Sequence, residues 1–137
     1  EKDCVLLYPQ DLVVADRFAE DAQTKIVPAD QVPAGWMALD IGPATVAAWQ
    51  GIFQKAGTII WNGPLGVYEM PAFSQGSFGV ARSMAASGAV TVVGGGDAVA
   101  AVKQAGCGDK MSHLSTGGGA SLELLEGKKL PGIEIMQ

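Results

Sequence analysis

The sequence has 137 residues, of which 48% are hydrophobic and 17% are charged, and its formal net charge is −5. A chain of this length can form one domain with a buried core, and it is too apolar and too weakly charged to stay disordered. Because the net charge is negative, the overall field does not favour nucleic acid or anionic lipid, so a phosphate site would need backbone N–H groups, helix N-termini or a metal ion.

Cysteine usage indicates the cellular compartment of the protein, and the first residues indicate how the chain begins. The two cysteines, Cys4 and Cys107, form no CxxC pair, which favours reduced cysteines in an intracellular protein over a disulfide framework or a zinc site. No apolar run approaches the roughly 20 residues of a membrane-spanning helix. The chain begins Glu1-Lys2-Asp3, without an initiator methionine or a signal peptide, so we expect a piece of a longer protein.

The first predicted elements are strands. Residues 4–8 and 12–15 are unbroken apolar runs on either side of Pro9, and such runs predict strands that are buried on both faces, as in parallel sheets. Residues 17–35 are more polar and contain two prolines. They predict a connecting segment with a short strand at residues 25–27.

The hydrophobic period changes near residue 45. Val46, Trp49, Phe53 and Ala56 recur at helical spacing, and Gly57 follows as a C-terminal stop. Residues 58–61 then predict a strand, and residues 71–87 predict a second helix that Gly88 ends.

Strand and helix continue to alternate as far as residue 126. We expect strands at residues 89–93 and 110–114 and helices at residues 97–105 and 120–126, joined by turns at residues 94–96 and 115–119. Alternation of this kind forms βαβ units, in which helices cover a parallel sheet. The predicted fold class is therefore α/β, in a single domain.

Three predicted strand ends carry glycine-rich segments: WNGPLGVYE at residues 61–69, GGGD at 94–97 and STGGGA at 115–120. Ligands of open α/β sheets bind outside the carboxyl ends of the strands, and parallel strands bring these ends to one edge. Glycine lets the backbone approach an anion, and the first N–H groups of a helix point at it. The segments match neither GxGxxG nor GxxxxGK[ST], so neither an NAD fingerprint nor a P-loop is indicated.

Residues in the last two turns have both a structural and a functional interpretation. Asp97 suits a helix N-cap, and beside the glycine turns it also suits a ligand of nucleotide-bound Mg²⁺; the two roles can coexist. Residues 117–119 can form a tight turn, but three consecutive glycines favour N–H groups aimed at an anion. Ser115 and Thr116 can cap the next helix or donate to a phosphoryl oxygen, and capping is favoured for Ser115.

Other polar and aromatic residues have a simpler interpretation when the residues are considered alone. Asn62 is a turn residue, and Glu69 is a solvated acid near a helix N-terminus. His113 lies in a predicted buried strand and is interpreted as a core histidine, not as a catalytic base. The tryptophans are interpreted as packing residues: Trp36, Trp49 and Trp61.

Taken in order, these segments resemble the phosphoglycerate kinase family. WNGPLGVYE, GGGD and STGGGASLE carry the resemblance, and LDIGP at residues 39–43 and EGKKLPG at residues 126–132 agree in order and spacing. The resemblance implies a Rossmann-like three-layer α/β/α fold with a mainly parallel sheet. Residues 1–137 would form part of the C-terminal, nucleotide-binding domain, incomplete relative to the full family domain.

The resemblance also implies site residues. Glu69 would bind the ribose, Pro64 and Val67 would lie against the adenine and sugar, and Asp97 would hold Mg²⁺. The full set implied for ATP or ADP is Asn62, Pro64, Gly66, Val67, Glu69, Gly95, Gly96, Asp97 and the backbone of Ala98. A catalytic set would face the transferred phosphoryl group: Thr116, Gly117, Gly118 and Gly119. Ala98 stands where the family usually has Ser or Thr, which removes a hydroxyl contact to the phosphates.

The implied reaction is reversible phosphoryl transfer between ATP and 3-phosphoglycerate, a step of glycolysis in the cytoplasm. In the family, a separate N-terminal domain binds 3-phosphoglycerate or 1,3-bisphosphoglycerate, and an earlier segment supplies a phosphate-contacting lysine. No counterpart of either is found in this chain, so we expect it to be inactive alone. The family is usually monomeric, but missing strands leave a sheet edge that invites self-association. The alternatives are another nucleotide-binding α/β enzyme and a non-catalytic interaction domain.

Overall fold

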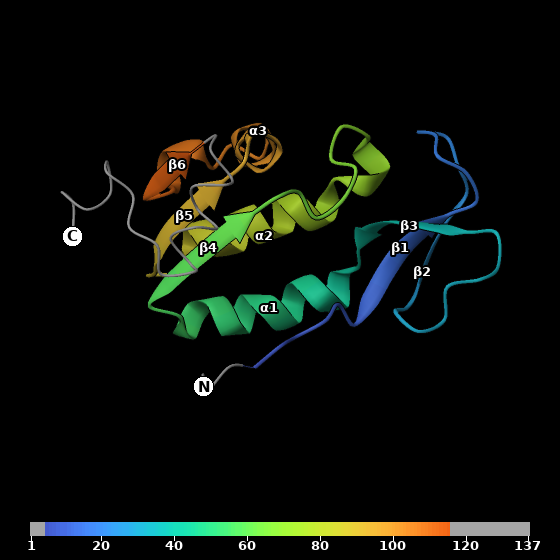
Figure 1. Ribbon diagram of the computed structural model, residues 1–137, viewed down its shortest axis with the longest axis horizontal. Helices are drawn as coiled ribbons and strands as arrows, with labels where there is room; N and C mark the ends of the chain where they lie inside the picture. The colour runs from blue at the N-terminus through green and yellow to red at the C-terminus, as the bar shows by residue number, and fades with distance from the viewer. Residues whose placement is uncertain (1–4, 116–137) are drawn as a thin grey trace.

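The computed structural model describes residues 5–115, which form two three-stranded sheets and a layer of helices (Figure 1). Sheet A contains β1 (Asp11–Ala15), β2 (Thr24–Pro28) and β3 (Met37–Ile41) in the order β2-β1-β3. Both of its pairings are antiparallel, with an irregularity between Val13 and Val14 of β1. The strands predicted at residues 12–15 and 25–27 are confirmed, but the parallel environment expected for the first is wrong.

The antiparallel pairing has a local cause. The connection from β1 to β2 closes a hairpin, in which the Asp16 N–H donates to the Gln23 carbonyl at 3.1 Å and the Gln23 N–H donates to Asp16 Oδ1 at 3.0 Å. A short hairpin can join only antiparallel strands. An apolar run reveals burial, but it does not reveal the direction of the neighbouring strand.

The apolar segment at residues 5–8 is not a strand, contrary to the prediction, and Cys4 lies outside the described residues. The side chains of Val5, Leu6, Leu7 and Tyr8 are 82%, 72%, 51% and 71% exposed. A strand needs a neighbour that accepts and donates backbone hydrogen bonds. None of the strands within residues 5–115 pairs with this segment.

Sheet B is parallel and has the strand order β4-β5-β6. Its strands are β4 (Thr58–Asn62), β5 (Val90–Gly94) and β6 (His113–Ser115). The predicted strand at residues 110–114 therefore begins later, because the short 3-10 helix η2 (Gly108–Lys110) occupies its first part. Ser115 belongs to β6 and not to the turn that was expected after it.

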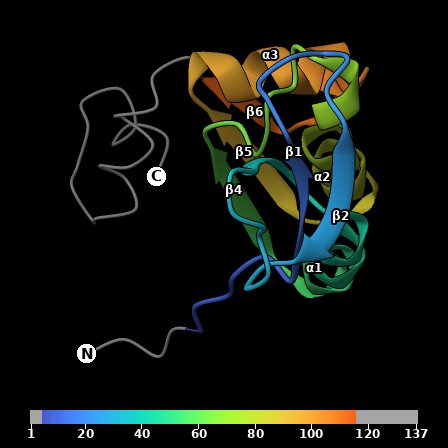
Figure 2. The same ribbon diagram turned by 90° about the vertical axis from the view of Figure 1, so that its right-hand side faces the viewer.

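Three helices cover sheet B: α1 (Pro43–Lys55), α2 (Gln75–Ala86) and α3 (Gly96–Gln104). Because β4, β5 and β6 are consecutive in the sheet, right-handed crossovers place α2 and α3 on the same face. α2 lies between α1 and α3 and contacts both (Figures 1 and 2). The helix predicted at residues 71–87 is divided, since the 3-10 helix η1 (Pro71–Phe73) precedes α2.

The main core lies between this helical layer and sheet B. Trp61 of β4, Val93 of β5, Met84 of α2 and Val102 of α3 are buried together there. A smaller core joins sheet A to η1 through Ala15, Leu39 and Phe73. The predicted α/β class with a parallel sheet is thus confirmed. No helix within residues 5–115 has the length and apolar character needed to cross a bilayer.

Asp11 connects sheet A to the helical layer. Its carboxylate accepts hydrogen bonds from the N–H groups of Ala44 (3.0 Å) and Thr45 (2.9 Å) and from the Thr45 hydroxyl (2.7 Å). These groups lie in the first turn of α1, whose own N-cap residue, Gly42, has no side chain to cap them. A Cβ on Gly42 would lie 2.3 Å from the Asp11 carboxyl carbon, so this close approach requires glycine.

Candidate functional site

The carboxyl ends of all three strands of sheet B meet at one edge. Asn62 of β4 is in register with Gly94 of β5, and Gly94 is in register with Ser115 of β6. Just beyond the strands, the Gly63 N–H donates to the Gly94 carbonyl at 3.4 Å, and the Gly95 N–H donates to the Ser115 carbonyl at 2.9 Å. The predicted convergence of the three glycine-rich segments is confirmed as far as the structure describes them.

The turn between β5 and α3 opens towards this edge. Gly95 has a φ of +94°, a region that L-residues rarely adopt, and α3 begins at Gly96. The N–H groups of Gly96, Asp97 and Ala98 belong to the first turn of α3 and therefore have no acceptor within the helix. No other residue would contact a Cβ on Gly96. This end of the helix is therefore suited to an anion.

Asn62 lies beside this turn. Its side chain is exposed at the end of β4, and its Oδ1 atom is 3.7 Å from the position of a Cβ on Gly95. The two predicted site residues are therefore neighbours, although they are far apart in the sequence. Pro64, further along the same loop, is also exposed.

The rest of the loop after β4 is anchored to the interior. The Val67 N–H donates to the Leu39 carbonyl at 2.9 Å, and the half-buried Val67 side chain packs against the smaller core. A Cβ on Gly66 would lie 2.4 Å from Asp40 Oδ1 and 2.8 Å from the Phe73 carbonyl oxygen. Gly66 thus has a packing reason to be glycine, and its predicted contact with nucleotide stays a prediction.

Asp40 is the buried group that holds this loop and α2 together. It is 4% exposed; its Oδ1 accepts from the Ile41 N–H and its Oδ2 from the Gly76 N–H, both at 2.8 Å. Burial raises the pKa of Asp40 to about 6, against the lowering effect of these two hydrogen bonds. Sequence reasoning used LDIGP only as a motif and missed this role, which the charged residue within an apolar strand could have indicated.

The charges of Glu69 and Asp97 both act on a buried tyrosine, Tyr68. Tyr68 is 8% exposed, and its pKa is raised first by burial and then by the charges of Glu69 and Asp97. Glu69 and Asp97 are themselves exposed. The predicted ribose-binding and metal-binding carboxylates are thus both near enough to Tyr68 for their charges to disfavour its ionised form.

Ala98 has its side chain in the main core, where it is fully buried. Only its backbone N–H can therefore face a ligand at the start of α3. A Ser or Thr, which the family usually has at this position, would therefore place its hydroxyl on a buried side chain.

The interpretation of His113 as a core residue is wrong, because its side chain is exposed. Within residues 5–115, β6 is an outer strand of sheet B, and such strands are less covered than central ones. The packing role of the tryptophans is confirmed. Trp61 is buried, Trp49 packs against the core, and the Lys25 ammonium lies 4.5 Å from the centre of the Trp36 ring.

The predicted catalytic residues Thr116, Gly117, Gly118 and Gly119 lie outside the described residues. Within residues 5–115 there is no group of three or more His, Cys, Asp or Glu side chains that could hold a metal ion. A lone exposed carboxylate such as Asp97 is compatible with a Mg²⁺ ion whose other ligands are nucleotide phosphates and water. Mg²⁺ usually binds to proteins in this way.

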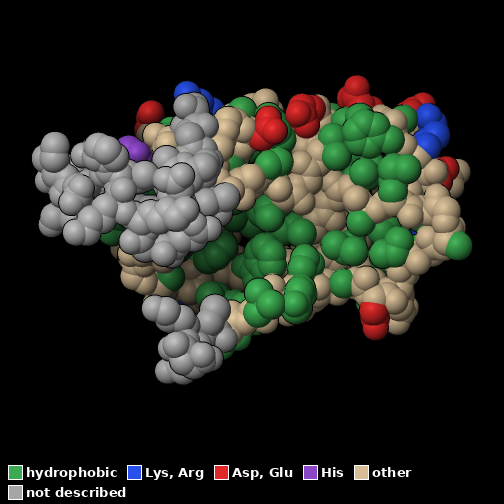
Figure 3. All heavy atoms as spheres, in the orientation of Figure 1, with side chains coloured by type: hydrophobic (Ala, Val, Ile, Leu, Met, Phe, Trp, Pro, Cys, Tyr) green, Lys and Arg blue, Asp and Glu red, His purple; other side chains and the backbone are tan. Residues whose placement is uncertain are grey.

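An apolar groove lies elsewhere, between sheet A, α1 and the start of α2. Its volume is about 470 Å³, and its lining includes Val13, Ile26, Ile41, Val46 and Gln50, with no charged side chain. Figure 3 shows hydrophobic side chains over α1 and sheet A, and acidic side chains along the upper edge of the same view. This groove has no charged side chain that could pair with a phosphate group.

Comparison with known proteins gives consistent matches over the whole length. The family model described as phosphoglycerate kinase matches residues 1–128. Phosphoglycerate kinases from Chloroflexus aurantiacus and Rubrobacter xylanophilus are 54% and 56% identical over 140 and 131 aligned residues, covering 100% and 96% of the chain. A relative named "Phosphoglycerate kinase, cytosolic" from Triticum aestivum is 54% identical over 135 residues, covering 96% of the chain and 34% of the relative.

Solved structures agree with these matches. Phosphoglycerate kinase from Coxiella burnetii superimposes with a TM-score of 0.82 and 46% identity, covering 94% of the chain and 33% of that structure. The Pyrococcus horikoshii enzyme gives a TM-score of 0.75 and 31% identity, covering 92% and 31%. The chain spans 35% and 33% of the first two relatives, about a third of their length.

Proposed function

The chain belongs to the phosphoglycerate kinase family, and from this premise we propose that it binds MgADP or MgATP at the carboxyl edge of sheet B. The observation that carries the proposal is the meeting of Asn62, the Gly95 turn and Asp97, in the first turn of α3, at that edge. The net charge of −5 does not attract a phosphate. Local backbone donors and a cation at Asp97 must therefore offset the repulsion between this net charge and the phosphates.

Each part of the nucleotide has a partner in this arrangement. The N–H groups of Gly96 and Ala98, which follow the Gly95 turn, face the phosphates, with the Asn62 side chain beside them. Asp97 holds Mg²⁺, which when bound neutralises charge on the phosphate oxygens. Glu69 accepts hydrogen bonds from the ribose hydroxyls. The base and sugar lie against the loop after β4, at Pro64, Gly66 and Val67.

The reaction of the whole enzyme is reversible phosphoryl transfer between ATP and 3-phosphoglycerate, a step of glycolysis. The acceptor is a carboxylate and already an anion, so the chemistry needs positioning and charge neutralisation and no general base. Thr116, Gly117, Gly118 and Gly119 are proposed to face the phosphoryl group in transfer. In keeping with the wheat relative's name, we place the protein in the cytoplasm.

This 137-residue chain supplies only the nucleotide-binding part and has no kinase activity alone. Its length, a third of the relatives, supports this, because the site for 3-phosphoglycerate or 1,3-bisphosphoglycerate belongs to the family's N-terminal domain. A coupled assay should detect no ATP formation from 1,3-bisphosphoglycerate and ADP. Measurable turnover by the purified chain would contradict this part of the proposal.

Calorimetry tests the binding proposal. ADP should bind more tightly with Mg²⁺ than with EDTA, and NADH should bind more weakly than MgADP. Asp97→Asn should remove most of the Mg²⁺ effect, whereas Asp109→Asn, at an exposed aspartate of η2, should not. A preference for NADH would favour another nucleotide-binding enzyme, and no nucleotide binding with a cooperative melt would favour a non-catalytic interaction domain.

We also propose that the isolated chain self-associates through β4. Within residues 5–115, β4 is paired on one side only, with β5, and the apolar side chains of residues 5–8 are exposed. Unpaired strand edges and exposed apolar segments favour association between chains. Sedimentation should show concentration-dependent dimers or larger species. A monomer at all concentrations would contradict the proposal.

A further inference from the structure

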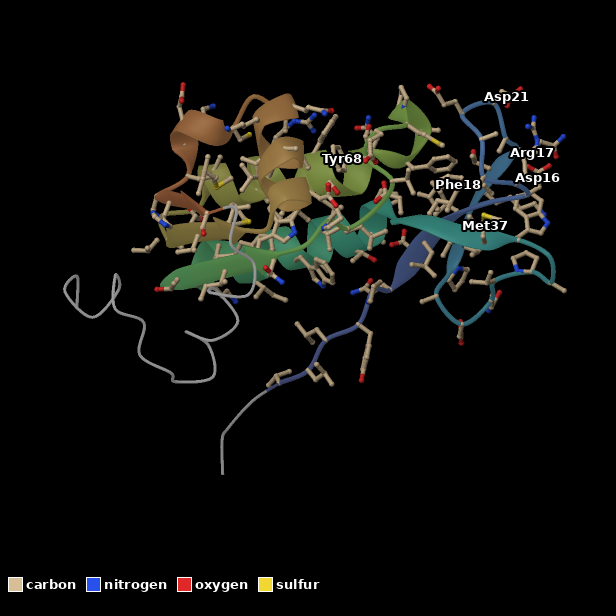
Figure 4. The ribbon with its side chains drawn as sticks, turned by 45° about the horizontal axis from the view of Figure 1, so that its top comes forward. Asp16, Arg17, Phe18, Asp21, Met37 and Tyr68 are labelled. Atoms are coloured by element: carbon tan, nitrogen blue, oxygen red, sulfur yellow. The ribbon has the colours of Figure 1, made fainter. Side chains whose placement is uncertain are left out.

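The loop between β4 and η1, on which Figure 4 labels Tyr68, is tied to two other elements of the fold. The Leu65 N–H donates to the hydroxyl of Ser77 in α2 at 3.3 Å, and Ser77 is fully buried. The Val67 N–H donates to the carbonyl of Leu39 in β3 at 2.9 Å. The conformation of the loop therefore depends on where the end of β3 and the start of α2 lie.

Asp40 joins these two elements and also touches the loop. From β3, its carboxylate accepts hydrogen bonds from the N–H of Gly76, at the start of α2, and from the neighbouring N–H of Ile41, both at 2.8 Å. Gly66 of the loop lies against the same carboxylate, because a Cβ on this glycine would be 2.4 Å from Asp40 Oδ1. One side chain, 4% exposed, thus sets the positions of the loop and of both its supports.

The charge of Asp40 costs stability, although it organises these contacts. The contacts are with Ile41, Gly66 and Gly76, none of which is titratable, and no charge of another residue within residues 5–115 acts on the carboxyl group. Burial raises the pKa of Asp40 to about 6 although both hydrogen bonds lower it, so the bonds do not fully offset desolvation. A buried group that is ionised at this cost is a candidate for a functional role.

The two N–H donors distinguish the ionised from the protonated form of Asp40. An ionised carboxylate has only acceptor oxygens and can receive both donors at once. Protonation places an O–H group on one of these oxygens, where it competes with the N–H of Ile41 or Gly76. The link between β3, the loop and α2 is therefore complete only in the ionised form.

We propose that Asp40 is a positioning residue, whose ionised carboxylate holds the loop after β4 in the conformation that binds the adenosine part of the nucleotide. This inference rests on the proposed function and deepens it, because Pro64, Val67 and Glu69 of this loop are the proposed contacts with base and ribose. The hydrogen bonds of Asp40 do not reach the Gly95 turn, where the phosphates are proposed to bind. Asp40 should therefore affect adenosine recognition and leave phosphate recognition unchanged.

Asp40→Asn tests the proposal, with Asp30→Asn as the matched control at an exposed aspartate. Asparagine keeps the shape of the side chain, but its NH₂ group replaces one of the two accepting oxygens. The affinities for MgADP and for Mg²⁺-pyrophosphate, which has no base or ribose, are measured by calorimetry. At about pH 8, Asp40→Asn should bind MgADP about tenfold more weakly than wild type, the effect of one hydrogen bond to a charged group. Its affinity for pyrophosphate should match wild type, as should both affinities of Asp30→Asn.

The pH profile separates positioning by the charge from a purely structural role. At about pH 5 wild-type Asp40 is mostly protonated, so the tenfold difference in MgADP affinity should shrink to about twofold. A difference that is the same at both pH values, or an equal loss of affinity for MgADP and pyrophosphate, would assign Asp40 a structural role only. MgADP affinity equal to wild type at about pH 8 would show that the loop does not depend on Asp40.

Wild-type protein without nucleotide separates this inference from the proposed function, and it does not require the variant to fold. In an NMR titration, the N–H signals of Ile41, Gly76 and Val67 should shift with pH through one shared midpoint near 6. Gly51, in an open part of α1, is the internal reference and should not follow this midpoint. Wild-type protein that shows the titration but binds no ADP would sink the proposed function. A Val67 signal that does not follow Ile41 and Gly76, or no shared midpoint at all, would sink the role of Asp40.

Discussion

Replacing Asp11 with asparagine should destabilise the fold by removing the charged cap of α1. The carboxylate accepts three hydrogen bonds, from the N–H groups of Ala44 and Thr45 and from the Thr45 hydroxyl. Asparagine keeps one oxygen and turns its NH₂ group towards donors, so at least one bond to a charged acceptor is lost, at about 1.5–3 kcal/mol. The charge also stabilises the helix N-terminus by about 0.3–1 kcal/mol. We expect a total loss of about 2–4 kcal/mol.

The effect of Asp11 should depend on pH in a defined direction. Burial raises the pKa of Asp11, but hydrogen bonds from Thr45 and Ala44 outweigh it, and the pKa lies below the usual 3.8. The folded state therefore holds the proton less tightly than the unfolded state. The stabilisation is complete above the unfolded-state value and is lost as pH falls through the folded-state value.

Urea unfolding followed by circular dichroism measures this difference at pH 7 and again below pH 3. Asp21→Asn is the control, because Asp21 is exposed and pairs only with Arg17, at 3.0 Å, on the surface; its unfolding midpoint should match wild type. If Asp11→Asn is as stable as wild type at pH 7, or if the difference is unchanged in acid, the carboxylate does not stabilise α1 as described.

The remaining predictions concern Asp40 and the glycines. Because the pKa of Asp40 is raised to about 6, the folded state binds its proton more tightly than the unfolded state. Stability should therefore rise by about 2 kcal/mol as pH falls from 7 to about 4, the reverse of Asp11; urea midpoints that stay flat or fall over this range would contradict it. Gly76→Ala should lose about 2–4 kcal/mol in the same assay, since its Cβ would lie 2.1 Å from Asp40 Oδ1. Gly51→Ala, in an open part of α1, should instead gain about 0.5–1 kcal/mol, and equal effects would refute the packing explanation. Gly95→Ala should lose about 1–2 kcal/mol because of its φ of +94° and should weaken MgADP binding in calorimetry; unimpaired binding would exclude this turn from the phosphate site.

The local pattern predicted most of the elements correctly, because helical spacing and buried strands depend on neighbouring residues. The region from α1 to α3 follows the expected order, with shifts of a few residues at the ends. The antiparallel sheet A was not predicted, since β1 has the same apolar run that a parallel strand would have. The strand predicted at residues 5–8 was wrong for a related reason. Burial of a strand depends on a partner strand, and the apolar run does not reveal whether a partner is present.

Glycine turns at strand ends predicted the edge of the sheet, whereas the role of Asn62 came only from the family resemblance; the structure brings Asn62, Gly95 and Asp97 to this edge. The residues that hold this arrangement were missed. Asp40 makes a contact across a long stretch of sequence, to Gly76 of α2, and no local spacing signals such a contact. Tyr68 is buried in a loop, where burial is also not signalled by spacing. A tyrosine in a loop is equally consistent with simple packing.

Backbone NMR with added MgADP tests the central claim most directly. The largest shift changes should fall on the N–H signals of Gly95, Gly96 and Asp97, with Asn62 and Gly63 also affected. Changes centred on Val13, Ile26 and Gln50, in the apolar groove beside α1, would contradict a nucleotide site at the edge of sheet B, and so would an unchanged spectrum.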